Sequence, residues 1–268
     1  MTPILAAAEY GGEFSGAFDN INALFDMPTL IEFSIGGLDL SLNRTVFIAW
    51  IMTAVAGLIM WAAFKDPKIV PGKMQSVGEG IIEFVRNIAL EIIGPKGLKF
   101  VPLLTTFFLA ILFLNLAKIT PIFMLPPTSR MAWPAFFAFV AWLVYVGVGV
   151  KEQGAGHYFK EMAFPPGVPK ALYIILTPLE LLSNLVLRPF TLAVRLFANM
   201  VAGHILVVIT LVTVHVFLYP RPGLPIGVFG LIASPLVFGF ELVIIVLQAY
   251  IFTMLTAVYI SSSVEPAH

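Results

Sequence analysis

The segment Arg188–Ile205, RPFTLAVRLFANMVAGHI, places two arginines and a histidine inside the apolar run Ala171–Tyr219. A charged side chain inside a bilayer is costly, and such residues pair with one another or mark ion pathways. Arg195 is a permanent cation, because the guanidinium does not deprotonate in proteins. It is suited to attract a carboxylate and to stop a proton relay from running past it. The structural alternative is a cation held by Glu180 or by a helix carbonyl.

Helical geometry separates the polar side chains around Arg195 into two faces. On an ideal helix Ala198 and Ala202 share the face of Arg195, and Asn199 lies about 40° away. Small residues on that face allow a second helix to approach closely. His204 points to the opposite face and titrates near neutral pH, so it suits a proton relay. Its alternative is a buried histidine that is simply hydrogen-bonded.

The last apolar segment carries a second polar pair, Glu241 and Gln248. Their spacing of seven residues puts them on one helix face. Glu241 is an ionisable group within a membrane segment and is a candidate for the proton path. Its structural alternative is a salt bridge to Arg188 or Arg195, and Gln248 could hydrogen-bond Arg195.

Arg188 and His215 each leave two interpretations open. Glu180 and Arg188 are separated by about 80° on the helical wheel. Arg188 either snorkels to the interface or holds Glu180. His215 either lines a channel entrance or is an incidental interfacial histidine.

Covalent catalysis has no support in the sequence. It contains no cysteine, which excludes thiolate metal sites and cysteine nucleophiles, and no GxSxG, P-loop, HExxH or paired-carboxylate motif. We therefore expect no cofactor and no metal, and proton movement along ionisable side chains is the chemistry that remains.

The elements that position these residues are membrane helices. Of 268 residues, 59% are hydrophobic and 11% are charged, which predicts an all-α integral membrane protein. The runs are continuous, so a β-barrel is disfavoured. The formal charge of zero argues against a nucleic-acid partner. The first residues carry no signal-peptide pattern.

We expect an acidic exterior segment over residues 1–44, a single membrane domain over 45–263 and a short tail over 264–268. Three spans are expected at 45–64, 100–125 and 133–150. An amphipathic interfacial helix is expected at 74–93, and a polar, Pro-rich loop at 151–170.

The segments 171–219 and 224–263 are too long for straight, upright spans. A straight helix over the first would be roughly 74 Å long, against a hydrocarbon slab of ~30 Å. No polar turn divides either segment, although Pro178, Pro189 and Pro235 can bend a helix. We therefore expect two bent, strongly tilted helices packed as a hairpin.

The distribution of lysine and arginine predicts the orientation of the chain. The loops 65–99 and 151–170 carry Lys65, Lys68, Lys73, Arg86, Lys96, Lys99, Lys151, Lys160 and Lys170. The other side carries Arg44, Lys118, Arg130 and Arg221. With five crossings, the N-terminus lies outside and the C-terminus lies in the cytoplasm.

Two stretches, RPFTLAVRLFANMVAGHI and ELVIIVLQAYIFTMLTAVYIS, closely resemble the subunit a family of rotary F-type ATP synthases. The resemblance is specific over Pro178–Ser261 and looser over the first three spans, where FLNLAKITP resembles a family motif at Asn115 and Pro121. It implies the stator half of a proton motor, in which two offset half-channels lead to the carboxylates of a rotating c-subunit ring.

By position in the motif, the resemblance implies that Arg195 faces the ring carboxylate and separates the half-channels. Asn199, His204, Glu241 and Gln248 then line the proton path, with Glu180 as a further member. The implied partners are the c-subunit ring, b-type peripheral-stalk subunits and membrane lipid. Lys118 departs from the family pattern; it either snorkels to the outer interface or alters the outer entrance.

The competing functions are an independent secondary ion transporter and a membrane enzyme. The absence of an internal repeat weakens the transporter, and the enzyme would need a nucleophile or a metal site. We expect the bacterial plasma membrane rather than the mitochondrial inner membrane.

Overall fold

The computed structural model describes residues 29–31, 34–35, 38–39, 42–120, 122–123, 125–164, 172–218 and 224–264. Most of the predicted acidic N-terminal segment lies outside these residues. So do Pro121, Lys170, Arg221 and the tail 265–268.

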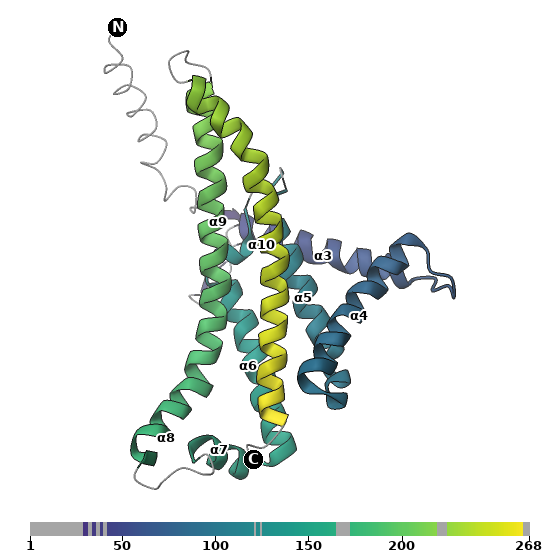
Figure 1. Ribbon diagram of the computed structural model, residues 1–268, viewed down its shortest axis with the longest axis vertical. Helices are drawn as coiled ribbons and strands as arrows, with labels where there is room; N and C mark the ends of the chain where they lie inside the picture. Colours follow the sequence, from purple (N-terminus) through teal and green to yellow (C-terminus); the bar gives the residue numbers. More distant parts are fainter. Residues whose placement is uncertain are drawn as a thin grey trace. The chain divides into compact units, whose positions relative to one another are not determined.

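The described chain is almost entirely helical (Figure 1). The α-helices are α3 (Arg44–Phe64), α4 (Lys73–Ile93), α5 (Val101–Leu116), α6 (Ala132–Gln153), α7 (Ala155–Ala163), α8 (Tyr173–Leu182), α9 (Arg188–Leu218) and α10 (Leu224–Val264). Shorter elements are the 3-10 helices η1 (Pro95–Phe100) and η2 (Pro127–Ser129) and the π-helix η4 (Ser183–Leu187).

Five helical segments of the described chain are long and apolar enough to cross a membrane. They are Arg44–Phe64, Pro95–Leu116, Ala132–Gln153, Tyr173–Leu218 and Leu224–Val264. Each has at least 21 residues, and about 20 apolar residues of α-helix span the hydrocarbon core. The prediction of an all-α membrane protein with five crossing segments is confirmed.

The second span ends earlier than the predicted residue 125. Helix α5 stops at Leu116, where the N–H groups of Lys118 and Ile119 donate to the carbonyls of Asn115 and Leu116. Such i→i+3 bonds tighten a last helical turn. The apolar run alone did not show this stop, because residues after the turn remain apolar.

The loop predicted over residues 151–170 contains a helix, which corrects that prediction. Gly154, at φ +83°, ends α6, and α7 begins at Ala155. Tyr158 is buried against the backbone of Gly149, and His157 and Glu161 form an i,i+4 pair at 3.6 Å. One anchored aromatic side chain and one helical pair thus favour a short helix.

Two short antiparallel strand pairs precede α3. Strand β1 (Thr29–Ile31) pairs with β4 (Leu42–Asn43), and β2 (Ser34–Ile35) pairs with β3 (Leu38–Asp39). The sequence analysis expected a loose segment here and did not predict these strand pairs.

The chain divides into two compact units. The first contains the described parts of Met1–Met52, Leu114–Pro127 and Asn199–Ile245; the second contains those of Thr53–Phe113, Thr128–Ala198 and Val246–His268.

In the first unit the C-terminal half of α9 packs along the N-terminal half of α10 (Figure 1). A Cβ on Gly227 would lie 2.6 Å from the backbone of Leu218, and one on Gly230 would lie 3.2 Å from the Val214 side chain. Glycine at both places lets the helices approach closely. The packing confirms the predicted hairpin.

The core of the second unit is aromatic. Phe107 contacts Phe137 and Phe252 edge-on, with ring centroids 6.3 and 5.7 Å apart. Phe84 brings α4 against α5 and α10 through Phe108 and Tyr250. Edge-on aromatic pairs at these distances stabilise beyond the area they bury.

The end of α10 is also fixed within the second unit. Ser261 Oγ donates to the carbonyl of Ile92, and Gln153 Nε2 donates to the carbonyl of Ser263, at 2.8 and 3.1 Å. The helix α4 is amphipathic, as predicted from its sequence.

The segment Tyr173–Leu218 is bent, as predicted. The π-helix η4 interrupts it between Pro178 and Pro189, and α8 departs from the line of the following helix (Figure 1). A proline removes one helical hydrogen bond and its ring clashes with the preceding turn, so a local change of helix type is its expected consequence.

Candidate functional site

Arg195 lies on an exposed face of α9. Thr191, Ala198 and Ala202 are exposed with it, whereas Leu192 and Leu196 are buried. Among the described residues, none forms a hydrogen bond or a salt bridge with Arg195. Neither Glu180 nor Gln248, the two intrachain partners considered from the sequence, holds the guanidinium. The structure therefore presents a cation beside two small side chains on the outer surface of an apolar helix.

The opposite face of α9 is buried, as the helical wheel predicts. His204 is 6% exposed, and Met200 beside it is fully buried. Asn199, one turn from Arg195, is half-buried. The arginine and the histidine therefore point to different surroundings.

A buried ion pair lies in the first unit. Lys118 Nζ donates to Glu241 Oε2, and the side-chain exposures of the two residues are 0% and 1%. The lysine follows the last turn of α5 and the glutamate lies on α10. The structure corrects one alternative for each residue: Lys118 does not snorkel outward, and Glu241 pairs with neither Arg188 nor Arg195. Burial of both charges requires this pairing, because a lone buried charge is strongly disfavoured.

Gly203 on α9 makes room for this pair. An added Cβ would lie 2.5 and 2.6 Å from the two carboxylate oxygens of Glu241, and it would also collide with Lys118 Nζ. Real Cβ atoms do not approach other atoms this closely. A methyl group at position 203 would therefore push the ammonium and the carboxylate away from the α9 backbone next to His204.

A second polar cluster lies in the second unit, at the π-helix. Asn184 donates from Nδ2 to the carbonyl oxygen and to Oε2 of Glu180, both at 3.0 Å. The hydroxyl of Tyr145 on α6 donates to the carbonyl of Asn184 at 2.7 Å. Carbonyls in a π-helical stretch are not committed to the regular α-helical pattern, which leaves them available to side-chain donors.

Arg188 belongs to the same unit and does not hold Glu180. Its Nη1 donates to Ser262 Oγ at 3.1 Å, and its guanidinium lies 5.3 Å from the ring centroid of Tyr259. Tyr259 in turn contacts Tyr145 edge-on at 5.7 Å. A cation over an aromatic face is stabilised by the ring quadrupole. The start of α9 is thereby attached to the end of α10.

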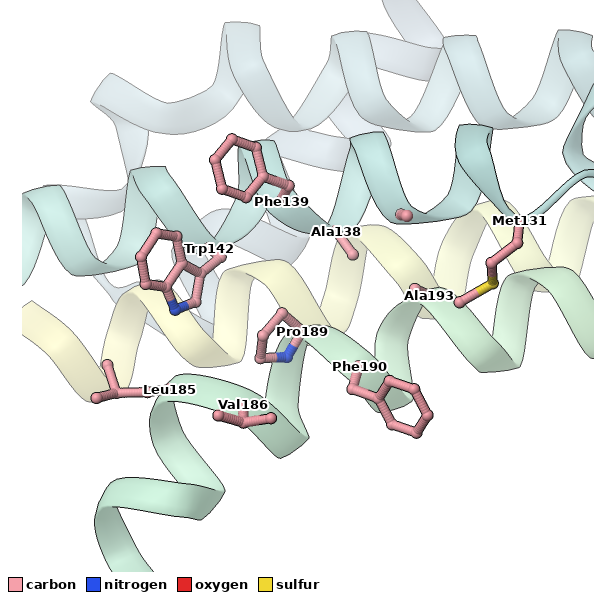
Figure 2. A pocket seen from close by; sticks show the side chains of 10 residues that line it. Met131, Ala138, Phe139, Trp142, Leu185, Val186, Pro189, Phe190 and Ala193 are labelled. Carbon is pink, nitrogen blue, oxygen red and sulfur yellow. The ribbon is translucent and has the colours of Figure 1, made fainter.

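A cavity of about 380 Å³ lies between α6 and the η4–α9 segment (Figure 2). Phe139 and Trp142 face it from α6, and Leu185, Pro189 and Phe190 face it from the other side. The lining is apolar, so this cavity offers no group that could carry a proton.

The remaining predicted residues are placed as follows. Gln248 is 4% exposed and lies in the second unit, Asn115 is fully buried at the end of α5, and His215 is exposed near the end of α9. Within the described residues no group of three His, Cys, Asp or Glu side chains is arranged to hold a metal ion.

Sequence reasoning missed Lys118 as the partner of Glu241, and it missed Gly203 and the Tyr145–Asn184 contact. One signal was present: Lys118 and Glu241 are opposite charges within apolar segments. Opposite charges in such segments commonly pair.

Comparisons with known proteins identify the family of the chain. The family model described as ATP synthase A chain matches residues 46–261. The subunit a of ATP synthase from Frankia alni is 40% identical over 265 residues, which cover 98% of this chain and 89% of that protein. The corresponding protein of Rhodococcus erythropolis is 40% identical over 223 residues, covering 82% and 81% of the two chains. That of Streptomyces lividans is 36% identical over 237 residues, covering 86% and 82%. The chain therefore belongs to the ATP synthase A chain family.

Proposed function

We propose that this chain is the stator half of the proton motor of an ATP synthase, and that Arg195 faces a carboxylate on a rotating ring of partner subunits. The exposure of Arg195 carries the proposal. A permanent cation on the surface of a membrane helix, with no acceptor among the described residues, needs an anion from outside the chain.

Small side chains beside Arg195 support a helical partner. Ala198 and Ala202 allow a second helix to pass close to the α9 backbone, so an acid on that helix can reach the guanidinium. A moving acid pairs with Arg195 once its proton has left. The fixed positive charge then keeps protons from crossing directly between the two access paths.

Two polar clusters provide the proposed access paths. His204, Glu241 and Asn199, all in the first unit, line the path from the outer side. Gln248 remains a member of the path by its place in the sequence motif. Glu180, with Asn184 and Arg188, lines the path to the cytoplasm. Proton transfer along each path uses groups that exchange protons or order water.

The proposed orientation places the N-terminus outside and the C-terminus in the cytoplasm of a bacterial cell. The excess of lysine and arginine in the loops 65–99 and 151–170 supports it, and the relatives named above are bacterial. The proposed partners are the c-subunit ring and the b-type subunits of the peripheral stalk.

The test is Arg195→Ala in the complete ATP synthase, reconstituted into vesicles. We expect normal assembly and loss of both ATP-driven proton pumping and proton-driven synthesis. Arg44→Ala is the matched control, since Arg44 is an exposed arginine at the start of α3. Retained synthesis in Arg195→Ala would contradict the proposal, and so would proton transport by the purified chain alone.

A further inference from the structure

Glu241 is an incompletely bound anion inside the first unit. Its Oε2 accepts from Lys118, whereas its Oε1 is buried and accepts no hydrogen bond from the described residues. One oxygen is therefore available to an arriving cation, and the other already holds a tethered one.

Lys118 lies close to more than one part of this cluster. Its ammonium binds Glu241 and lies against Gly203, the residue that precedes His204. The turn after α5 thus places a positive charge beside the carboxylate that the proposed function assigns to the outer path.

We propose that Lys118 is a specificity-determining residue, a tethered counter-cation that keeps metal cations off Glu241 while protons exchange there. This inference rests on the proposed function, because it concerns the ion that the outer path accepts. Lys118 acts through Glu241 and touches no partner ring.

The selectivity follows from simple electrostatics. A second unit charge about 4 Å from an ammonium group is disfavoured roughly 10³-fold at an effective dielectric constant of about 20. A sodium ion has only its attraction to the carboxylate to offset this repulsion. An arriving proton meets the same repulsion, but it forms a covalent O–H bond at Oε1, which sodium cannot do, and it later passes to the next acceptor.

Gly203 supplies the geometry that this selectivity needs. A side chain there would displace the ammonium from the carboxylate, as the close approach of an added Cβ shows. We therefore expect Gly203→Ala to weaken the exclusion of metal cations while both charged residues remain in place.

The experiment measures passive proton flux through the assembled membrane sector in vesicles, at neutral pH, with sodium chloride or choline chloride at equal ionic strength. Wild-type flux should be the same in both salts. In Lys118→Met the flux should fall about tenfold or more in sodium, because the unopposed carboxylate now binds that ion. Gly203→Ala should show a smaller fall, and Gly147→Ala, which has open space around the added Cβ, should show none.

If Lys118→Met does not fold, Lys118→Gln tests the same point. Its side-chain amide can still donate to Glu241, but it carries no charge. It should show the same sensitivity to sodium. A Lys118→Gln sector that assembles and conducts equally in both salts would overturn the inference, and so would wild-type flux that itself responds to sodium. Neither result bears on the proposed role of Arg195, which Arg195→Ala tests separately.

Discussion

Arg195 and Lys118 are two cations with opposite surroundings. Arg195 lies on an exposed face of α9 and has no hydrogen bond or salt bridge among the described residues. Lys118 is completely buried and bound to Glu241. Both are costly in a membrane protein, but only the second is compensated by another of the described residues. The difference indicates that Arg195 serves a partner, whereas Lys118 serves the chain's own carboxylate.

The largest expected effect on stability comes from breaking the buried pair. Lys118→Met leaves the Glu241 carboxylate without its counter-charge, and loss of one partner of a buried pair costs about 3–5 kcal/mol. Thermal unfolding of the purified complex measures this loss. The double variant Lys118→Met, Glu241→Met is the control, and it should recover most of the stability because both charges are gone. A single variant as stable as the wild type would show that the pair does not hold the fold.

Arg195→Ala should behave in the opposite way. It removes an exposed side chain that has no hydrogen bond or salt bridge to the described residues, so the stability of the chain's own fold should change by no more than about 0.5 kcal/mol. The loss of pumping expected above would then be a loss of function at full stability. If Arg195→Ala destabilised the complex as much as Lys118→Met, Arg195 would stabilise the fold as Lys118 does, and the contrast between the two cations would be wrong.

Much of the exposed arginine face could be predicted from the sequence. Helical periodicity places Arg195, Ala198 and Ala202 on one face and His204 on the other, and the structure has the same division. Such local geometry follows from the 3.6-residue repeat. The long apolar runs likewise predict the membrane helices.

The buried pair could not be predicted in this way. Lys118 and Glu241 are 123 residues apart in the chain, and periodicity within one helix does not say which helices meet. The short helix α7 and the π-helix η4 were missed for a related reason. Both depend on contacts with other segments, those of Tyr158 with Gly149 and of Tyr145 with Asn184.

An intermediate effect on stability is expected at Gly203, because this residue packs directly against the buried pair. Gly203→Ala forces the Lys118 and Glu241 side chains to shift, and overpacking of this kind costs about 1–3 kcal/mol. Gly147→Ala places the same methyl group in open space on a helix, where it should stabilise by about 0.5–1 kcal/mol. The difference between the midpoints of thermal unfolding of the two variants measures how tightly Lys118 and Glu241 pack against Gly203. Equal midpoints would contradict the close approach.

A smaller destabilisation than that of Lys118→Met is expected at Arg188, an arginine with partners inside the chain. Arg188→Ala removes the hydrogen bond to Ser262 and the contact with Tyr259, which together contribute about 1–2 kcal/mol. Pumping should persist at a reduced rate, and a pumping assay alongside thermal unfolding separates the two effects. Loss of pumping as complete as that of Arg195→Ala would remove the distinction between the two arginines of α9.

Cysteine cross-linking tests the central claim, that the Arg195 face meets a partner, most directly. The chain has no cysteine of its own, so a single introduced thiol reports one position. In the complete complex, Ala198→Cys and Ala202→Cys are each combined with a cysteine placed next to the carboxylate of the ring subunit. The account predicts disulfides from both positions and none from Leu58→Cys, an exposed position on α3. Absence of cross-links from Ala198 and Ala202, or equal cross-linking from Leu58, would contradict it.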